Sequence, residues 1–243
     1  MKPILSGRIS TEQMGFLKGR HIQDTIGTAH ECLHNIKKYK LKALVLKLDL
    51  RKAYVCIGWD FLRLILHKIG LEAQMTKWIM TCVTSSSFVV LINGEASDSF
   101  RSGRGVRQGC LLSPLLFVLV MEGLNVLLKQ IFVEGLLSGI KVSTMTRILH
   151  LLFADDVLIL SKASLLEWQV IINLINRFDK ASGLTVNPLK LAIHYEGVLE
   201  IELNCCKSFL PYTFSKLSLG FRYLSYILKT GTQRATNWEW LVV

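Results

Sequence analysis

Two adjacent aspartates, Asp155 and Asp156, stand between two apolar segments, residues 149–153 and 157–160. Adjacent carboxylates are not stable in the middle of a buried strand without a counter-charge, because moving a charge out of water is very costly. A hairpin removes this conflict, since its turn brings both carboxylates to the end of two buried strands. The pattern therefore predicts a β-hairpin with an acidic tip, and an ordinary solvated Asp-Asp turn is the alternative.

A third aspartate, Asp49, directly follows the apolar segment 44–48, which ends with the alternation of a strand. If this strand lies beside the acidic hairpin, three carboxylates gather at neighbouring strand ends. Such a group suits Mg²⁺, because hard cations prefer oxygen ligands. Two Mg²⁺ roughly 3.5–4 Å apart stabilise both the attacking and the leaving oxygen of a phosphoryl transfer. A single metal ion or a cluster of salt bridges fits the same residues.

The remaining periodicity predicts helices separated by hairpins. Gly70 and Gly183 stand where helix C-caps are typical. A strand that runs into the turn Asn93-Gly94 and pairs back with residues 98–101 is the pattern of a second hairpin. Antiparallel hairpins with helices between them favour an α+β fold over a doubly wound parallel sheet, and only short strands are expected after residue 183. Helices are predicted over residues 28–39, 59–69, 73–82, 115–131 and 165–181.

The chain is basic, with 29 Lys and Arg against 18 Asp and Glu and a formal net charge of +11. This excess suits a partner made of phosphates, because each neutralised phosphate releases counterions; a basic protein without such a partner is the alternative. The six cysteines lack the CxxC spacing of a zinc site, so we expect reduced thiols in an intracellular protein. The apolar segment 111–128 contains Ser113, Pro114 and Glu122, so we expect a buried core helix and no membrane attachment.

Several segments resemble the reverse transcriptases of LINE-type (non-LTR) retrotransposons, above all those of plants. Residues 48–54, Leu-Asp-Leu-Arg-Lys-Ala-Tyr, resemble the first palm motif of that family, and residues 104–109 with 112–117 resemble the second. Residues 153–156, Phe-Ala-Asp-Asp, match the third motif. The matches follow the family's order from about residue 8 to residue 228. The others are Trp59-Asp60-Phe61-Leu62, Ser182-Gly183-Leu184 with Asn187 and Lys190, Tyr223-Leu224-Ser225, Gln13-Met14-Gly15-Phe16, Lys18-Gly19-Arg20 and Asp24.

The resemblance implies a right-hand polymerase palm, which is an antiparallel sheet packed on helices, with part of the fingers and with the thumb absent. Residues 1–40 would be the partial fingers segment, residues 41–230 the reverse transcriptase palm, and residues 231–243 an unassigned tail. The implied activity is that of an RNA-directed DNA polymerase, whose partners are an RNA template, a DNA primer and dNTPs. The resemblance implies nothing about the oligomeric state.

The resemblance also assigns roles to single residues near the aspartates. Asp49, Asp155 and Asp156 would bind two Mg²⁺, with the carbonyl oxygen of Leu50 assisting. Tyr54 falls where the family has an aromatic residue beneath the incoming sugar, and a ring there excludes a 2′-hydroxyl by contact. An ordinary core aromatic residue is the alternative for Tyr54.

Four further residues would contact the nucleotide. Gln108 and Gly109 belong to a loop that packs on the incoming nucleotide, where glycine permits a close approach of the backbone. Arg20 would contact the triphosphate, and Lys190 would donate a proton to the leaving pyrophosphate. For these last two residues, a solvated surface charge is the alternative.

The chain also departs from the family pattern. Val55 and Cys110 stand where the family usually has aspartate, and the usual Leu-Pro is missing before Tyr223. These departures support a second hypothesis, a catalytically inactive retrotransposon relic that at most binds nucleic acid non-specifically. A different metal-dependent phosphotransferase would leave the Gln-Gly and Ser-Gly-Leu segments unexplained.

Overall fold

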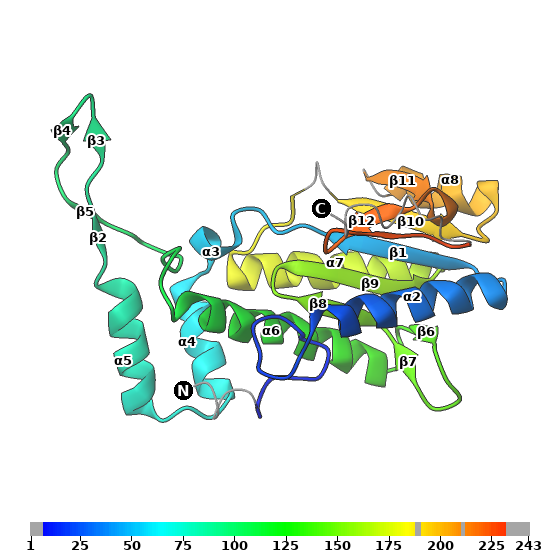
Figure 1. The fold of residues 1–243 in the computed structure, drawn as a ribbon, viewed down its shortest axis with the longest axis horizontal. Helices are drawn as coiled ribbons and strands as arrows, with labels where there is room; N and C mark the ends of the chain where they lie inside the picture. The colour runs from blue at the N-terminus through cyan, green and yellow to red at the C-terminus, as the bar shows by residue number, and fades with distance from the viewer. Residues whose placement is uncertain (1–6, 188–190, 210–211, 232–243) are drawn as a thin grey trace.

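The computed structural model describes residues 7–187, 191–209 and 212–231, and its centre is a five-stranded sheet (Figure 1). The strands are, in their order across the sheet, β11 (Thr213–Lys216), β10 (Ala192–Glu196), β1 (Ala43–Leu48), β9 (Asp156–Lys162) and β8 (His150–Phe153). Neighbouring strands are antiparallel, except that β10 and β11 are parallel. The α+β prediction and the acidic hairpin, β8 to β9, are confirmed, while the parallel pair departs from a fully antiparallel sheet.

Helices cover one face of this sheet, and a helix with a small hairpin covers the other, because the central strands are apolar on both sides. On β1, Leu44, Leu46 and Leu48 belong to one core, and Ala43 and Val45 belong to a second core on the opposite face. The first core includes residues of α4 (Trp59–Lys68), α6 (Ser113–Val133) and α7 (Leu165–Ser182). The second includes residues of α2 (Ile22–Lys38), β12 (Phe221–Tyr223) and β13 (Tyr226–Leu228).

Helix α6 is long and apolar enough to cross a membrane by length and composition alone. In the fold, every residue from 115 to 122 is buried, so the first half of the helix is enclosed on all sides. Its contacts are with α4 and α7 beneath the sheet. The expectation of a buried core helix over 111–128 is confirmed.

A hairpin extends away from the sheet beyond α5 (Ala73–Thr84) (Figure 1). It contains the predicted turn at Asn93-Gly94, with Gly94 at a φ of +88°. Its two short pairs are β2 (Ser87–Phe88) with β5 (Phe100–Arg101), and β3 (Leu91–Ile92) with β4 (Glu95–Ala96). The second predicted hairpin is therefore confirmed.

The structure corrects the prediction for the segment after α7, where only strands were expected. Helix α8 (Glu200–Phe209) connects β10 to β11, and such a crossover is what a parallel pair requires. The sequence of α8 hides this helix because it is short and its apolar residue Ile201 is 79% exposed. Of the predicted tail 231–243, only Gly231 lies within the described residues. The other short elements are α3 (Ala53–Cys56), β6 (Ile140–Lys141), β7 (Arg147–Ile148) and the 3₁₀ turn η1 (Leu217–Leu219).

The segment before α2, which we call the N-terminal strap (residues 10–20), is bound to the edge of the sheet. The N–H of Met14 donates to the carbonyl of Leu152 at 2.8 Å, and the N–H of Leu152 donates to the carbonyl of Glu12 at 3.0 Å. These bonds form a short parallel bridge beside β8. A segment assigned to the fingers thus contacts the strand that leads to Asp155.

A buried histidine on β8 predicts a pH-dependent stability. The ring of His150 is 2% exposed and its Nε2 lies 2.6 Å from Oδ1 of Asn125. Burial lowers the pKa of His150 to about 4, against the partial opposition of Glu12, whereas its ordinary pKa is 6.5. Because the unfolded chain binds this proton more tightly, the stability is complete above about pH 6.5 and is lost as the pH falls toward 4.

We expect this one residue to cost about 2 kcal/mol of unfolding free energy between pH 7 and pH 5. Urea denaturation at both pH values should therefore show a smaller loss for His150→Gln than for the unchanged chain, by about that amount. An equal loss in both proteins would show that other groups cause the pH dependence.

Candidate active site

The strand register brings the predicted carboxylates to one end of the sheet. Leu48 pairs with Val157 across β1 and β9, so Asp49 follows β1 beside Asp156, the first residue of β9. Side chains alternate between the faces of a strand, and both aspartates continue the series that faces α2. Asp155 lies in the adjoining turn between β8 and β9. The predicted adjacency of the two acidic strand ends is therefore observed.

The two neighbouring carboxylates act on the proton affinity of Asp156. Burial raises the pKa of Asp156, the positive charge of Lys47 opposes this, and the charges of Asp155 and Asp49 add to it. Within residues 7–187, 191–209 and 212–231, no three His, Cys, Asp or Glu side chains are placed so that together they could hold a metal ion. The donor set nevertheless fits Mg²⁺ in chemistry, since it offers carboxylate oxygens whose mutual repulsion a divalent cation would relieve.

The segment after Gly183 borders Asp49. The N–H of Asn187 donates to the carbonyl of Asp49 at 2.8 Å, and its side-chain amide lies 3.5 Å from Oδ2 of the same residue. Leu50, the predicted carbonyl ligand, forms an antiparallel bridge with Val186. The first motif segment and the segment that follows Ser182-Gly183-Leu184 are thus joined by backbone hydrogen bonds at the acidic end of the sheet.

A cavity of about 470 Å³ is lined by three predicted nucleotide contacts and by none of the three aspartates. These are Tyr54, Gln108 and Gly109, and a volume of this size suits a small ligand. The ring of Tyr54 stacks on Phe117 with a centroid distance of 5.0 Å. Burial and then the negative charge of Asp155 raise the pKa of Tyr54, so this cavity residue lies within electrostatic reach of the acidic turn.

The other two predicted contacts are not brought to this cavity among the described residues. The guanidinium of Arg20 donates to the carbonyls of Ile9 at 3.1 Å, of Ser10 at 2.5 Å and of Gln13. These bonds favour a structural role for Arg20 within the strap, and contact with a triphosphate stays a prediction. Lys190 lies outside the described residues.

Lys47 is a residue of the site that the sequence analysis missed. Its ammonium donates to the carbonyl of Arg222 at 2.9 Å, which ties β1 to β12, and its charge acts on Asp156. The signal was available, because Lys47 precedes Asp49 by two residues and a strand places such residues on one face. Phe16, which is 55% exposed, also lines the cavity, and its motif had been noted without a role.

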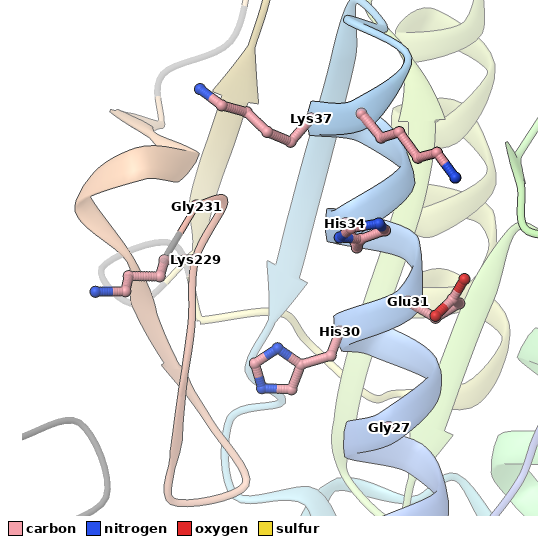
Figure 2. A pocket seen from close by; sticks show the side chains of 8 residues that line it. Gly27, His30, Glu31, His34, Lys37, Lys229 and Gly231 are labelled. Carbon is pink, nitrogen blue, oxygen red and sulfur yellow. The ribbon is translucent and has the colours of Figure 1, made fainter. Parts of the chain in front are cut away.

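A larger cavity of about 750 Å³ lies elsewhere, between α2 and residues 229–231. Figure 2 shows His30, His34 and Lys37 along one side of α2, with Lys229 across from them. None of the predicted site residues lines this cavity, and its one carboxylate is that of Glu31. Its size alone does not make it the reactive site, because it is lined by none of the residues that the sequence motifs single out.

The comparison with known families agrees with the site. A family model described as "Reverse transcriptase (RNA-dependent DNA polymerase)" matches residues 1–228. The chain belongs to the reverse transcriptase family. Among curated relatives, a transposon TX1 protein of Xenopus laevis is 27% identical over 93% of this chain and 16% of its own length. A Pol polyprotein of the type-1 retrotransposable element R2 from Popillia japonica is 28% identical over 65% of this chain and 26% of its own length.

Solved structures show that this reverse transcriptase chain has part of a polymerase fold. Apo telomerase from Candida tropicalis matches 97% of the chain and 39% of its own length, with a TM-score of 0.59 and 13% identity. Telomerase from Candida albicans matches 78% of the chain and 31% of its own length, with a TM-score of 0.57 and 12% identity. Likeness at this identity shows the fold alone, and the chain spans less than half the length of these relatives.

Proposed function

We propose that this reverse transcriptase domain takes part in RNA-directed DNA synthesis, by transfer of dNTPs to the 3′-hydroxyl of a primer on an RNA template. The observation that carries the proposal is the juxtaposition of the acidic strand ends with the cavity lined by Tyr54, Gln108 and Gly109. Nucleotidyl transfer needs these two parts together, since the carboxylates serve the reacting phosphate and the cavity holds the nucleotide. The net charge of +11 suits nucleic acid as the partner.

In this proposal Asp49, Asp155 and Asp156 would hold two Mg²⁺, with the carbonyl of Leu50 as a further ligand. The metal ions would supply charge neutralisation at the attacking and leaving oxygens. The chain's own groups then have separate tasks. The ring of Tyr54 limits the space beside the sugar, and the backbone at Gly109 permits close approach of the nucleotide. Lys47 supplies a positive charge behind Asp156.

The test is incorporation of labelled dNTPs on a primed RNA template, with the purified chain and with the chain completed by flanking segments of a related element. We expect extension that requires Mg²⁺ and follows the template sequence. A second candidate, a relic that only binds nucleic acid, is favoured by Val55 and Cys110 at positions of family aspartates. Binding of the primed template by both proteins, without extension by either, would establish that alternative.

We also propose that the sequence derives from a plant LINE-type element. The support is an uncharacterized mitochondrial protein of Arabidopsis thaliana that is 48% identical over 67 residues, or 27% of this chain and 55% of its own length. Sequencing of the genomic neighbourhood in the source organism tests this proposal. We expect other fragments of the same element type on both sides of the coding region.

Val55 and Cys110 stand where the family usually has aspartate, and we expect that restoring aspartate at both positions increases dNTP incorporation. Val55 lines a cavity with Arg104 and Arg107, where an aspartate would find cationic partners. A hydrogen bond from the N–H of Leu112 is the main cause that lowers the pKa of the Cys110 thiol. A carboxylate at position 110 would therefore accept hydrogen bonds from backbone N–H groups at the start of α6. We expect Val55→Asp with Cys110→Asp to raise incorporation by the completed chain about tenfold.

The matched control for this double variant is Val126→Asp, because Val126 is similarly exposed, 55% against 48% for Val55, and lies on α6 away from the cavity. Primer-extension rates of the three proteins should separate the double variant from the other two. Equal rates would mean that Val55 and Cys110 do not limit the activity.

We expect the ring of Tyr54 to determine the preference for deoxyribose over ribose in the incoming nucleotide. Tyr54→Val removes the ring and should lower the preference for dNTPs over rNTPs by roughly 10- to 200-fold, since one steric contact in a pocket discriminates by about that factor. Tyr54→Phe keeps the ring and should keep the preference. The ratio of kcat/KM for dGTP and GTP measures the effect, and an unchanged ratio in Tyr54→Val would leave Tyr54 as a core aromatic residue.

A further inference from the structure

We infer that Gln13, on the N-terminal strap, is a positioning residue that holds the turn carrying Asp155 and Asp156 in register with Asp49. The inference rests on the proposed function, because it concerns the same acidic residues. It adds a residue that touches neither metal nor nucleotide and acts through the backbone of Ala154.

The hydrogen bonds of Gln13 point to this role. Its side chain is fully buried, and its Oε1 accepts the N–H of Gly15 at 3.0 Å and the N–H of Ala154 at 3.1 Å. Both partners are donors, so the amide oxygen has to face them. Ala154 precedes Asp155 directly, and the Gln13 side chain therefore holds the first residue of the acidic turn.

The turn itself needs external support. Ala154 has a φ of +54°, which is the left-handed region that a residue with a Cβ rarely adopts. A strained turn of this kind persists when surrounding contacts determine it. The hydrogen bond from Ala154 to Gln13 is such a contact, and without it the Ala154 N–H would be buried with no acceptor.

The strap is built to reach this turn closely. A Cβ on Gly15 would lie 2.5 Å from the backbone nitrogen of Ala154, so only glycine permits the observed approach. The strap is also anchored on both sides of Gln13, by the ion pair of Glu12 with Lys129 at 2.7 Å and by the N–H of Met14, which donates to the carbonyl of Leu152 at 2.8 Å. The position of Gln13 is therefore fixed by the strap, and Gln13 holds the backbone of Ala154 in place.

The amide nitrogen of Gln13 opposes folding. Its Nε2 is buried and has no hydrogen-bond partner among the described residues. A buried donor without a partner opposes folding, and the two hydrogen bonds that the amide oxygen accepts have to offset this cost. The acceptor oxygen aimed at the catalytic turn gives a physical reason for a glutamine here.

The test measures Mn²⁺ binding to the whole chain, by electron paramagnetic resonance of free Mn²⁺, beside thermal unfolding of each variant. Gln13→Met keeps the size and removes the acceptor, and we expect Mn²⁺ affinity to fall roughly 10- to 100-fold, as for groups that orient metal ligands. Gln13→Glu restores the acceptor and should recover most of the affinity. Gly15→Ala, which pushes on Ala154 directly, should weaken Mn²⁺ binding in the same direction.

Asn35→Leu is the matched control, because Asn35 is also buried and its amide donates to two backbone carbonyls, of Lys141 and Val142, away from the acidic residues. It should lower the unfolding temperature and leave Mn²⁺ affinity unchanged. Wild-type affinity in Gln13→Met, or an equal loss in Asn35→Leu, would overturn the inference and leave the proposed function standing. Unchanged Mn²⁺ affinity in Asp155→Asn would instead overturn the proposed function, and the inference with it.

Discussion

Replacement of Asp155 by Asn is expected to reduce Mg²⁺-dependent dNTP incorporation by at least about a hundredfold. A metal ion at a reacting phosphate supplies several kcal/mol of transition-state stabilisation, and each ~1.4 kcal/mol is a factor of ten in rate. Asparagine keeps the size of the side chain and removes the charge that would hold the metal. Because Asp155 is exposed at the tip of the hairpin, the unfolding free energy should change by no more than about 0.5 kcal/mol.

The matched control is Asp98→Asn, since Asp98 is also exposed and lies on the protruding hairpin far from the acidic strand ends in the fold. Both substitutions remove one negative charge from a chain whose formal net charge is +11, so they change the total charge equally. Primer extension under single-turnover conditions, with the completed chain, measures both variants. Full activity in Asp155→Asn would mean that the acidic hairpin is not the reactive centre.

Gly183→Ala is expected to destabilise the fold by at least about 3 kcal/mol. Gly183 has a φ of +76°, and a Cβ there would lie 2.5 Å from the carbonyl oxygen of Cys56. Neither backbone can move easily, because the N–H of Gly58 donates to the carbonyl of Ser182 at 2.7 Å. The cost therefore combines a left-handed backbone with a collision between two motif segments.

Gly135→Ala separates these two causes. Gly135 also follows a helix, with a φ of +75°, but a Cβ there would meet nothing within 4 Å. Its cost should be limited to about 1–2 kcal/mol for the backbone conformation. Urea denaturation of both variants measures the difference, and equal costs would show that the contact with Cys56 relaxes freely. Where Gly183→Ala still folds, the bonds of Asn187 to Asp49 should also be disturbed, since they follow directly in the chain.

Local physical rules were sufficient for much of the fold. The pair Asp155–Asp156 between apolar segments determined the hairpin β8 to β9, because charge cannot remain inside a buried strand. Helical periodicity located α4, α5, α6 and α7 to within a few residues, and Asn93-Gly94 located the protruding hairpin. The longer α2 differs, since it begins at Ile22 where the side chain of Asp24 accepts the N–H of His21. Helix α8 was missed because its pattern is short and partly exposed.

The sequence by itself predicted which residues bear the chemistry, since the ordered motif segments contain the aspartates, Tyr54, Gln108 and Gly109. Only the tertiary structure decided how they are supported. It joined the acidic end of β1 to β9, turned Arg20 toward the carbonyls of the strap, and placed Lys47 behind Asp156. Gln13 and Ala154 are 141 residues apart in the chain. Contacts over such separations leave no periodic pattern in a sequence, because they arise from the packing of elements rather than from the geometry within one.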